Sequence, residues 1–139
     1  MKIVLDSNVV IDIIQKQNPT RKNIQMRIKS GDEVIIPEHV IREVIKKIPN
    51  GQEAIINWLV KQNPMKLTFL RDTEKIIKKA ESFEAKFTYC HWPDSRIIAH
   101  CSEYDAVLVT RDQKMRLCAD FLGVMTTSPY NLGGFVQAA

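Results

Sequence analysis

Lys2-Ile-Val-Leu-Asp-Ser-Asn8 begins the chain as a short apolar run that ends in an acid and two small polar residues. A helix-like segment, 9–14, follows it directly. Open α/β sheets bind their ligands at the carboxyl ends of the strands, so Asp6 stands where a site would form. Asp is also a favoured helix N-cap. Considered alone, Asp6 is better explained as a cap than as a ligand.

Strand-like and helix-like segments alternate along the rest of the chain. Predicted strands cover residues 2–5, 33–37, 66–70, 106–110 and 124–127, and predicted helices cover 9–14, 20–29, 38–48, 52–61, 72–87, 94–104 and 113–122. This alternation predicts an α/β fold, with a mostly parallel sheet of about five strands and helices on both of its faces. Right-handed crossovers would connect the strands, although their order in the sheet does not follow from the sequence.

Length and composition are those of an ordinary globular protein. The 139 residues, 45% of them hydrophobic, predict one domain over 1–129 and a loose tail over 130–139. No uncharged apolar run approaches the roughly 18 residues that a membrane span needs, and no signal peptide is evident at the N-terminus. Three cysteines without paired spacing are typical of a reduced protein. We therefore expect a cytoplasmic protein that does not associate with a membrane.

The charge balance is basic overall, at +4, with 20 basic and 16 acidic residues. Setting four acids aside for a metal site leaves 20 basic side chains against 12 acidic ones. A basic surface around an acidic pocket suits a polyanionic substrate, because Lys and Arg attract phosphates. A charge of +4 on a chain of this length is unremarkable, so the net charge alone does not identify a substrate.

Four carboxylates are predicted to share one rim of the sheet. Asp6 ends the first strand, Glu43 lies early in the helix after the second, Asp94 begins the helix that leads to the fourth, and Asp112 follows the fourth. Carboxylates brought close together repel one another, and a hard divalent cation relieves the repulsion. Each acid also has a simpler explanation, since Asp94 and Asp112 could cap helices and Glu43 could lie on a helix surface. The rim therefore favours a metal site without establishing one.

Four fragments in order carry a resemblance to a known family. They are Ile3-Val-Leu-Asp-Ser-Asn-Val-Val-Ile-Asp12, Ile36-Pro-Glu-His-Val-Ile-Arg-Glu43, Asp94-Ser-Arg-Ile-Ile-Ala99 and Leu108-Val-Thr-Arg-Asp112. The four acids in them are separated by 37, 51 and 18 residues. From residue 1 to about 129 the chain resembles the PIN-domain family of metal-dependent ribonucleases, particularly the toxins of VapBC toxin–antitoxin pairs.

The resemblance implies a three-layer α/β/α fold and an acidic pocket that holds one or two Mg²⁺ or Mn²⁺ ions. It implies hydrolysis of single-stranded RNA to a 5′-phosphate and a 3′-hydroxyl. Asp6 and Asp94 would be direct metal ligands, Asp112 would bind the metal directly or through water, and Glu43 would orient a water molecule. Asn8 and Thr110 match positions that support such pockets.

The same resemblance implies partners. RNA would be the substrate, and a cognate antitoxin and a second copy of the chain would be protein partners. Four cations near the proposed rim are candidates for phosphate contacts: Arg96, Arg111, Lys114 and Arg116.

Other enzyme classes fit the opening motif less well. A phosphatase of the haloacid dehalogenase type needs a second Asp two residues after the first, and that position is Asn8. A receiver domain needs a Lys after its fifth strand, where Thr126-Thr127 stands. The alternative from another class is a PIN-like module that binds RNA or a protein partner without cleaving. Magnesium-dependent RNA cleavage separates this module from the enzyme.

The segment before Asp94 is open to two interpretations. Tyr89 and Trp92 could stack an unpaired base, although core packing is the favoured role of both rings. Zinc could be suggested by the Cys and His residues in and around this segment. Their spacing fits no zinc finger, so ordinary packing is favoured for them.

Overall fold

Five parallel strands form the centre of the computed structural model, which describes residues 1–15, 22–24, 28, 31–62 and 66–130. The strands are β1 (Lys2–Leu5), β2 (Glu33–Pro37), β3 (Lys66–Leu70), β4 (Val107–Val109) and β5 (Thr126–Thr127). Their order in the sheet is β3-β2-β1-β4-β5. All neighbouring strands pair in parallel, so the carboxyl ends of all five lie at one edge of the sheet.

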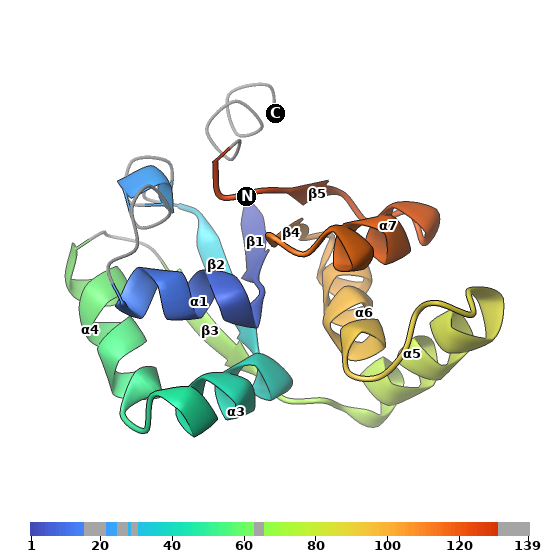
Figure 1. Cartoon of the computed structure of the whole chain (residues 1–139), viewed down its shortest axis with the longest axis horizontal. Helices are drawn as coiled ribbons and strands as arrows, with labels where there is room; N and C mark the ends of the chain where they lie inside the picture. The colour runs from blue at the N-terminus through green and yellow to red at the C-terminus, as the bar shows by residue number, and fades with distance from the viewer. Residues whose placement is uncertain (16–21, 25–27, 29–30, 63–65, 131–139) are drawn as a thin grey trace.

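Helices cover both faces of this sheet, which gives the three-layer α/β/α architecture that was expected. One layer contains α1 (Ser7–Ile14), α3 (Glu38–Lys47) and α4 (Gly51–Gln62), which pack against one another. The other contains α5 (Glu74–Lys86), α6 (Asp94–Tyr104) and α7 (Gln113–Phe121). Figure 1 shows the two groups on opposite sides of the strands. Right-handed crossovers account for this division, since the chain moves from β1 towards β3 and then back across to β4 and β5.

The sheet forms the middle of the hydrophobic core. Ile3, Val4 and Leu5 of β1 have no exposed surface, and β2 is also buried along most of its length. A strand covered on both faces reads as a continuous apolar run, which is the pattern that the sequence shows here. Among the described residues no helix is long and apolar enough to cross a membrane.

Apart from the helix predicted over 20–29, the predicted element boundaries lie within two residues of those in the structure. The strands over 33–37 and 66–70 and the helix over 94–104 begin and end where predicted. The strands predicted over 106–110 and 124–127 are shorter, and Gly123 ends α7 with a φ of 79°. Of the helix predicted over 20–29, residues 22–24 are helical and most others lie outside the described residues, as does the tail over 131–139.

The cysteines and one of the two histidines in question pack as structural side chains. Cys90, Cys101 and Cys118 are buried and form no disulfide. His100 is fully buried, and its Nε2 atom lies 2.8 Å from Oδ1 of Asp72. Ordinary packing, which was favoured for Cys90, His91, His100 and Cys101, therefore agrees with the structure for three of them, whereas His91 is exposed.

Candidate active site

The chain changes direction across the sheet between β1 and β4, which are neighbours in the sheet but far apart in sequence. The helix after β1 belongs to one layer and the helix after β4 to the other. Open α/β sheets leave a crevice for ligands at the carboxyl ends of two such strands. Asp6 follows β1, and Thr110 follows β4. The strand order, which the sequence could not supply, therefore places both residues at this switch point.

Asp6 is held by hydrogen bonds of its backbone and of its carboxylate, which also accepts a longer one from Asn8 Nδ2 at 3.5 Å. Its backbone N–H donates to the Val109 carbonyl oxygen at 3.1 Å. Its carboxylate accepts the Ser7 N–H at Oδ1 (2.8 Å) and the Thr110 hydroxyl at Oδ2 (2.7 Å). The Ser7 contact makes Asp6 the N-cap of α1, and its side chain is also almost completely buried. From the sequence, capping a helix and lining a site were alternative roles for Asp6. In the structure the same side chain does both.

Asp112 combines the same two properties. It is the N-cap of α7, and its Oδ1 atom accepts the Lys114 N–H at 2.9 Å and the Met115 N–H at 3.3 Å. Its own backbone N–H donates to the Thr110 hydroxyl oxygen at 3.0 Å. Both capping bonds use Oδ1, so Oδ2 has no hydrogen-bond partner among the described residues and is available to a ligand.

Asp94 and Glu43 reach the same region from two further helices. Asp94 is the first residue of α6, where Pro93 occupies the N-cap position, and no side-chain capping bond is formed there. Asp94 therefore lies in the first turn and is not a cap. Glu43 is on α3, with its side chain 41% exposed, and its Oε1 atom lies 2.6 Å from Nε2 of His39 one turn earlier.

These four carboxylates line one cavity of about 160 Å³, which we call the acidic cavity. The residues around it are Asp6, Ser7, Asn8, Ile11, Glu43, Lys47, Asp94 and Asp112. The structure thus brings together all four acids predicted for the rim. It also brings Asn8 into the lining, while Thr110 supports the cavity from behind through its bond to Asp6.

The electrostatics of the acidic cavity disfavour four negative charges. Burial, followed by the charges of Asp6 and Asp112, raises the pKa of Asp94 from 3.8 to about 6. Burial also raises the pKa of Asp6, whereas its hydrogen bonds from Thr110 and Ser7 oppose that rise. Buried carboxylates that repel one another bind protons more tightly unless a cation neutralises them.

The donor set fits a hard divalent cation. Carboxylate and amide oxygens are the ligands that Mg²⁺ takes in proteins, usually together with several waters. Ser7 and Asn8 line the acidic cavity, and their buried atoms Ser7 Oγ and Asn8 Oδ1 have no hydrogen-bond partner within the described part of the chain. Buried polar atoms without partners are uncommon, and a hydrated ion would supply partners here.

The acids surround the cavity without converging on one point. Among the described residues, no three His, Cys, Asp or Glu side chains lie close enough together to hold an ion jointly. Mutual repulsion and the capping bonds of Asp6 and Asp112 both favour such separation. The assignment of Asp6, Asp94 and Asp112 as metal ligands therefore stays a prediction.

Two of the four predicted phosphate-binding cations are already paired within the chain. Arg96 Nη1 lies 3.2 Å from Oδ2 of Asp72, and Arg111 binds Asp12 through both Nε (2.7 Å) and Nη2 (3.2 Å). Lys114 is close enough for its charge to oppose the rise in the pKa of Asp94. Arg116 lines a shallow hollow on α7 outside the acidic cavity.

Sequence reasoning missed two residues of the site and misjudged a third. Lys47 and His39 stand one turn on either side of Glu43, a spacing that places all three on one helix face and could have identified them. Trp92 was expected in the core together with Tyr89. Both rings are instead exposed, by 58% and 67%. Their short segment, between α5 and α6, has no apolar periodicity from which burial could be inferred.

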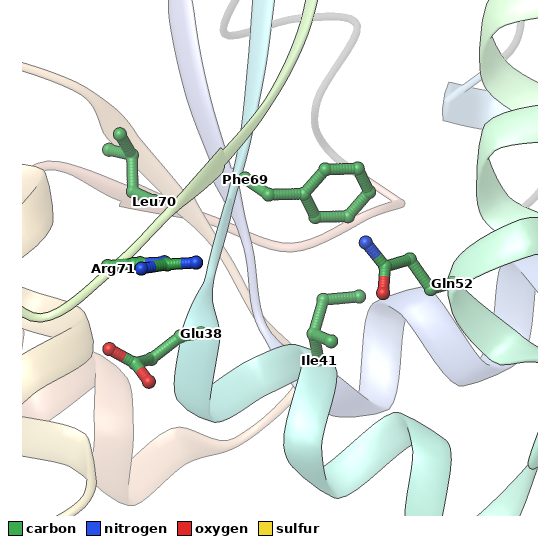
Figure 2. A pocket seen from close by; sticks show the side chains of 6 residues that line it. All are labelled: Glu38, Ile41, Gln52, Phe69, Leu70 and Arg71. Carbon is green, nitrogen blue, oxygen red and sulfur yellow. The ribbon is translucent and has the colours of Figure 1, made fainter.

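A different cavity, of about 360 Å³, lies between the end of β3 and helices α3 and α4 (Figure 2). Figure 2 shows Phe69, Ile41 and Gln52 on one side of it and Arg71 and Glu38 on the other. The Glu38 carboxylate already accepts the Asp72 N–H at 2.5 Å and lies 2.6 Å from Nη2 of Arg42. None of the four acids lines this cavity, so we place the candidate site in the smaller acidic cavity.

Comparison with models of known protein families identifies the family of this chain. The family model described as "PIN domain" matches residues 3–120. No curated protein sequence matches the chain significantly.

Many solved structures share the fold at low sequence identity. VapBC-1 from nontypeable Haemophilus influenzae has a TM-score of 0.69 at 16% identity, covering 94% of this chain and 99% of that one. FitAcB from Neisseria gonorrhoeae has a TM-score of 0.67 at 17% sequence identity, covering 92% of this chain and 98% of that one. A toxin–antitoxin complex from Klebsiella pneumoniae has a TM-score of 0.66 at 19% identity, and the coverage of the two chains is again 92% and 98%. At these identities the likeness concerns the fold alone.

Proposed function

The chain belongs to the PIN domain family, and on this basis we propose that it is a divalent-metal-dependent endoribonuclease acting on single-stranded RNA. One observation carries the proposal. Four carboxylates from separate elements line a single cavity at the switch point of the sheet. Burial, followed by the charges of Asp6 and Asp112, raises the pKa of Asp94 to about 6, and binding a cation would offset the cost of holding these charges together.

Each residue of the acidic cavity has a proposed role. Asp6 and Asp94 would hold a Mg²⁺ or Mn²⁺ ion directly, and the unbonded Oδ2 of Asp112 would hold it directly or through water. A divalent ion at such a site polarises a phosphoryl group and lowers the pKa of water. Glu43, whose Oε1 atom lies 2.6 Å from Nε2 of His39, would orient the attacking water and accept its proton.

The substrate assignment depends on charge and on the size of the cavity. Lys47 lines the acidic cavity and Lys114 lies near Asp94, so cations stand beside the acids where a phosphate backbone would enter. The cavity, at about 160 Å³, is too small for a nucleotide. An extended single strand would therefore lay one phosphate into it while the flanking bases stay outside. The products would be a 5′-phosphate and a 3′-hydroxyl.

We also propose that the chain is the toxin of a toxin–antitoxin pair. Three structures with this fold are described as VapBC-1, FitAcB and a toxin–antitoxin complex. A cognate antitoxin and a second copy of the chain are the protein partners that follow from this proposal. Co-expression with the product of an adjacent gene, followed by purification of a stable complex, tests the pairing.

A cleavage assay tests the enzyme directly. The purified chain is incubated with several labelled single-stranded RNAs and with Mg²⁺, Mn²⁺ or EDTA. We expect metal-dependent cleavage that Asp94→Asn reduces by at least two orders of magnitude. Glu81→Gln, a matched change of an exposed acid on α5, should leave the rate unchanged. Equal rates for wild type and Asp94→Asn would contradict the proposal. Metal-independent binding without cleavage of any RNA would favour the non-cleaving module.

A further inference from the structure

The large aromatic side chain of Trp92 is exposed to solvent beside the acidic cavity. Its side chain is 58% exposed, and it stands two residues before Asp94. Two residues of chain span at most about 7 Å, so the backbone of Trp92 is close to that of the acid. Its indole contacts the His39 ring in an edge-to-face arrangement, with 5.0 Å between ring centroids and 72° between planes. His39 in turn contacts Glu43. The ring is thus positioned by the site while more than half of its surface stays exposed.

A groove of about 340 Å³ runs along this ring, and we call it the Trp92 groove. It is lined by His39, Arg42, Glu43, Ile45, Lys46 and Trp92. Glu43 lines both this groove and the acidic cavity, so the two are adjacent. Of two consecutive lysines, Lys46 lines the groove and Lys47 lines the acidic cavity.

The Trp92 groove carries two cations, Arg42 and Lys46, and one acid, Glu43. Arg42 is paired with Glu38 at 2.6 Å. Lys46 and Lys47 are exposed, and neither forms an ion pair with any residue that the structure describes. An apolar ring flanked by unpaired cations is the combination that binds single-stranded nucleic acid, in which aromatic rings stack on bases and cations contact phosphates.

We propose that the Trp92 groove is a nucleobase-stacking subsite, in which one unpaired base of the RNA lies on the Trp92 indole. Lys46 and Lys47 contact the backbone phosphates that lead from this base to the acidic cavity. This inference rests on the proposed function, because it takes RNA as the substrate. It adds a residue that positions the substrate outside the four carboxylates. Since every base has an aromatic face, the subsite tolerates many sequences.

The test measures binding first, in EDTA, where no metal-dependent cleavage occurs. Anisotropy of a labelled single-stranded RNA is followed for wild type, Trp92→Ala and Trp92→Phe. Stacking of one base contributes about 1–3 kcal/mol, so we expect Trp92→Ala to weaken binding about 5- to 150-fold. Trp92→Phe should restore most of the affinity. Leu117→Ala, which removes another exposed apolar side chain, on α7, serves as the control and should bind as wild type does.

Fluorescence gives a direct signature of stacking. The chain has two tryptophans, Trp58 and Trp92. In a Trp58→Phe variant whose circular dichroism matches wild type, RNA should quench the remaining emission with the same midpoint as the anisotropy change. An unquenched signal, together with equal affinity of wild type and Trp92→Ala, would overturn the subsite.

Cleavage kinetics separate this inference from the proposed function. With Mn²⁺ present, Trp92→Ala should raise KM by the same factor as the loss of affinity and change kcat little. Cleavage that depends on Asp94 but is unaffected by Trp92→Ala would contradict the subsite and leave the nuclease intact. RNA binding that depends on Trp92 without any cleavage would contradict the nuclease and leave the subsite intact. If Trp92→Ala instead converts a dimer into a monomer at unchanged RNA affinity, a second copy covers the groove and the subsite is wrong.

Discussion

The Thr110 hydroxyl donates a 2.7 Å hydrogen bond to Oδ2 of Asp6, although the two residues are 104 positions apart in sequence. The same hydroxyl oxygen accepts the backbone N–H of Asp112 at 3.0 Å. One side chain therefore fixes two of the four carboxylates relative to each other. Because β1 and β4 are adjacent in the sheet, the two ends of the chain build the acidic cavity together.

Replacing Thr110 by Val should loosen this arrangement while keeping the shape of the side chain. The bond to Asp6 lowers the pKa of that carboxyl, so its loss raises the pKa and makes the ionised ligand less available. The Asp112 N–H also loses its acceptor, and a partly buried hydrogen bond of this kind contributes about 0.5–1.5 kcal/mol. We expect at least tenfold slower cleavage and a lower melting temperature.

Thr110→Ser is the matched control for that experiment, because it keeps the hydroxyl and removes only a methyl group. It should retain most of the cleavage rate. If Thr110→Val and Thr110→Ser cleave equally, the hydroxyl does not organise the site.

The second prediction concerns the pH dependence of stability without metal. The pKa of Asp94 is raised from 3.8 to about 6 in the fold, so between these values the folded protein binds a proton that the unfolded chain has released. Stability contributed by Asp94 is therefore present below about pH 4 and is lost as the pH rises through 6. Asp94→Asn removes this loss, which is worth about 3 kcal/mol by the pKa values alone and about 2 kcal/mol once solvent screening of this partly exposed carboxylate is included.

A competing effect reduces that gain. Asp94 lies in the first turn of α6, where a negative charge stabilises the helix by about 0.3–1 kcal/mol. We therefore expect Asp94→Asn to raise the free energy of unfolding by about 1–2 kcal/mol at pH 7 and to change it little at pH 4. Urea unfolding at both pH values, in EDTA, measures the difference. A variant less stable than wild type at pH 7 would show that the dipole outweighs the repulsion.

The third prediction separates the two roles of Asp112. Asn is as good an N-cap as Asp but carries no charge, whereas Ala is a poor cap. Asp112→Asn should therefore abolish most cleavage at nearly unchanged stability, while Asp112→Ala should lose the same activity and about 1 kcal/mol of stability as well. Thermal unfolding and cleavage rates of both variants provide the comparison. A fully active Asp112→Asn would leave Asp112 with a capping role only.

The sequence and the structure agree on features that local chemistry determines. Apolar runs such as Glu33–Pro37 and the spacing on α6 define buried elements, and parallel strands bring their carboxyl ends to one edge, so the grouping of Asp6, Glu43, Asp94 and Asp112 could be foreseen. The strand order could not be predicted, because the sequence of one strand does not specify which strands lie beside it. The hydrogen bond between Thr110 and Asp6 depends on that order, so it could not be predicted either.

Side chains outside the regular elements were the least predictable. Trp92 and Tyr89 are large and aromatic, so burial was the natural expectation, yet they lie in a connection whose path no periodic pattern sets. Arg96 and Arg111 were predicted to face a substrate, but each forms an ion pair with an acid distant in sequence, Asp72 and Asp12 respectively. Long charged side chains find partners that only the tertiary fold reveals.

Direct binding of Mn²⁺ tests the central claim, that the acidic cavity is a divalent-metal site. Calorimetric titration of the metal-free chain at pH 6 should give saturable binding with proton release, since Asp94 is partly protonated near its pKa of about 6. Asp94→Asn should weaken the binding at least tenfold, and Glu81→Gln should not change it. The absence of saturable binding, or equal affinity of wild type and Asp94→Asn, would contradict the account.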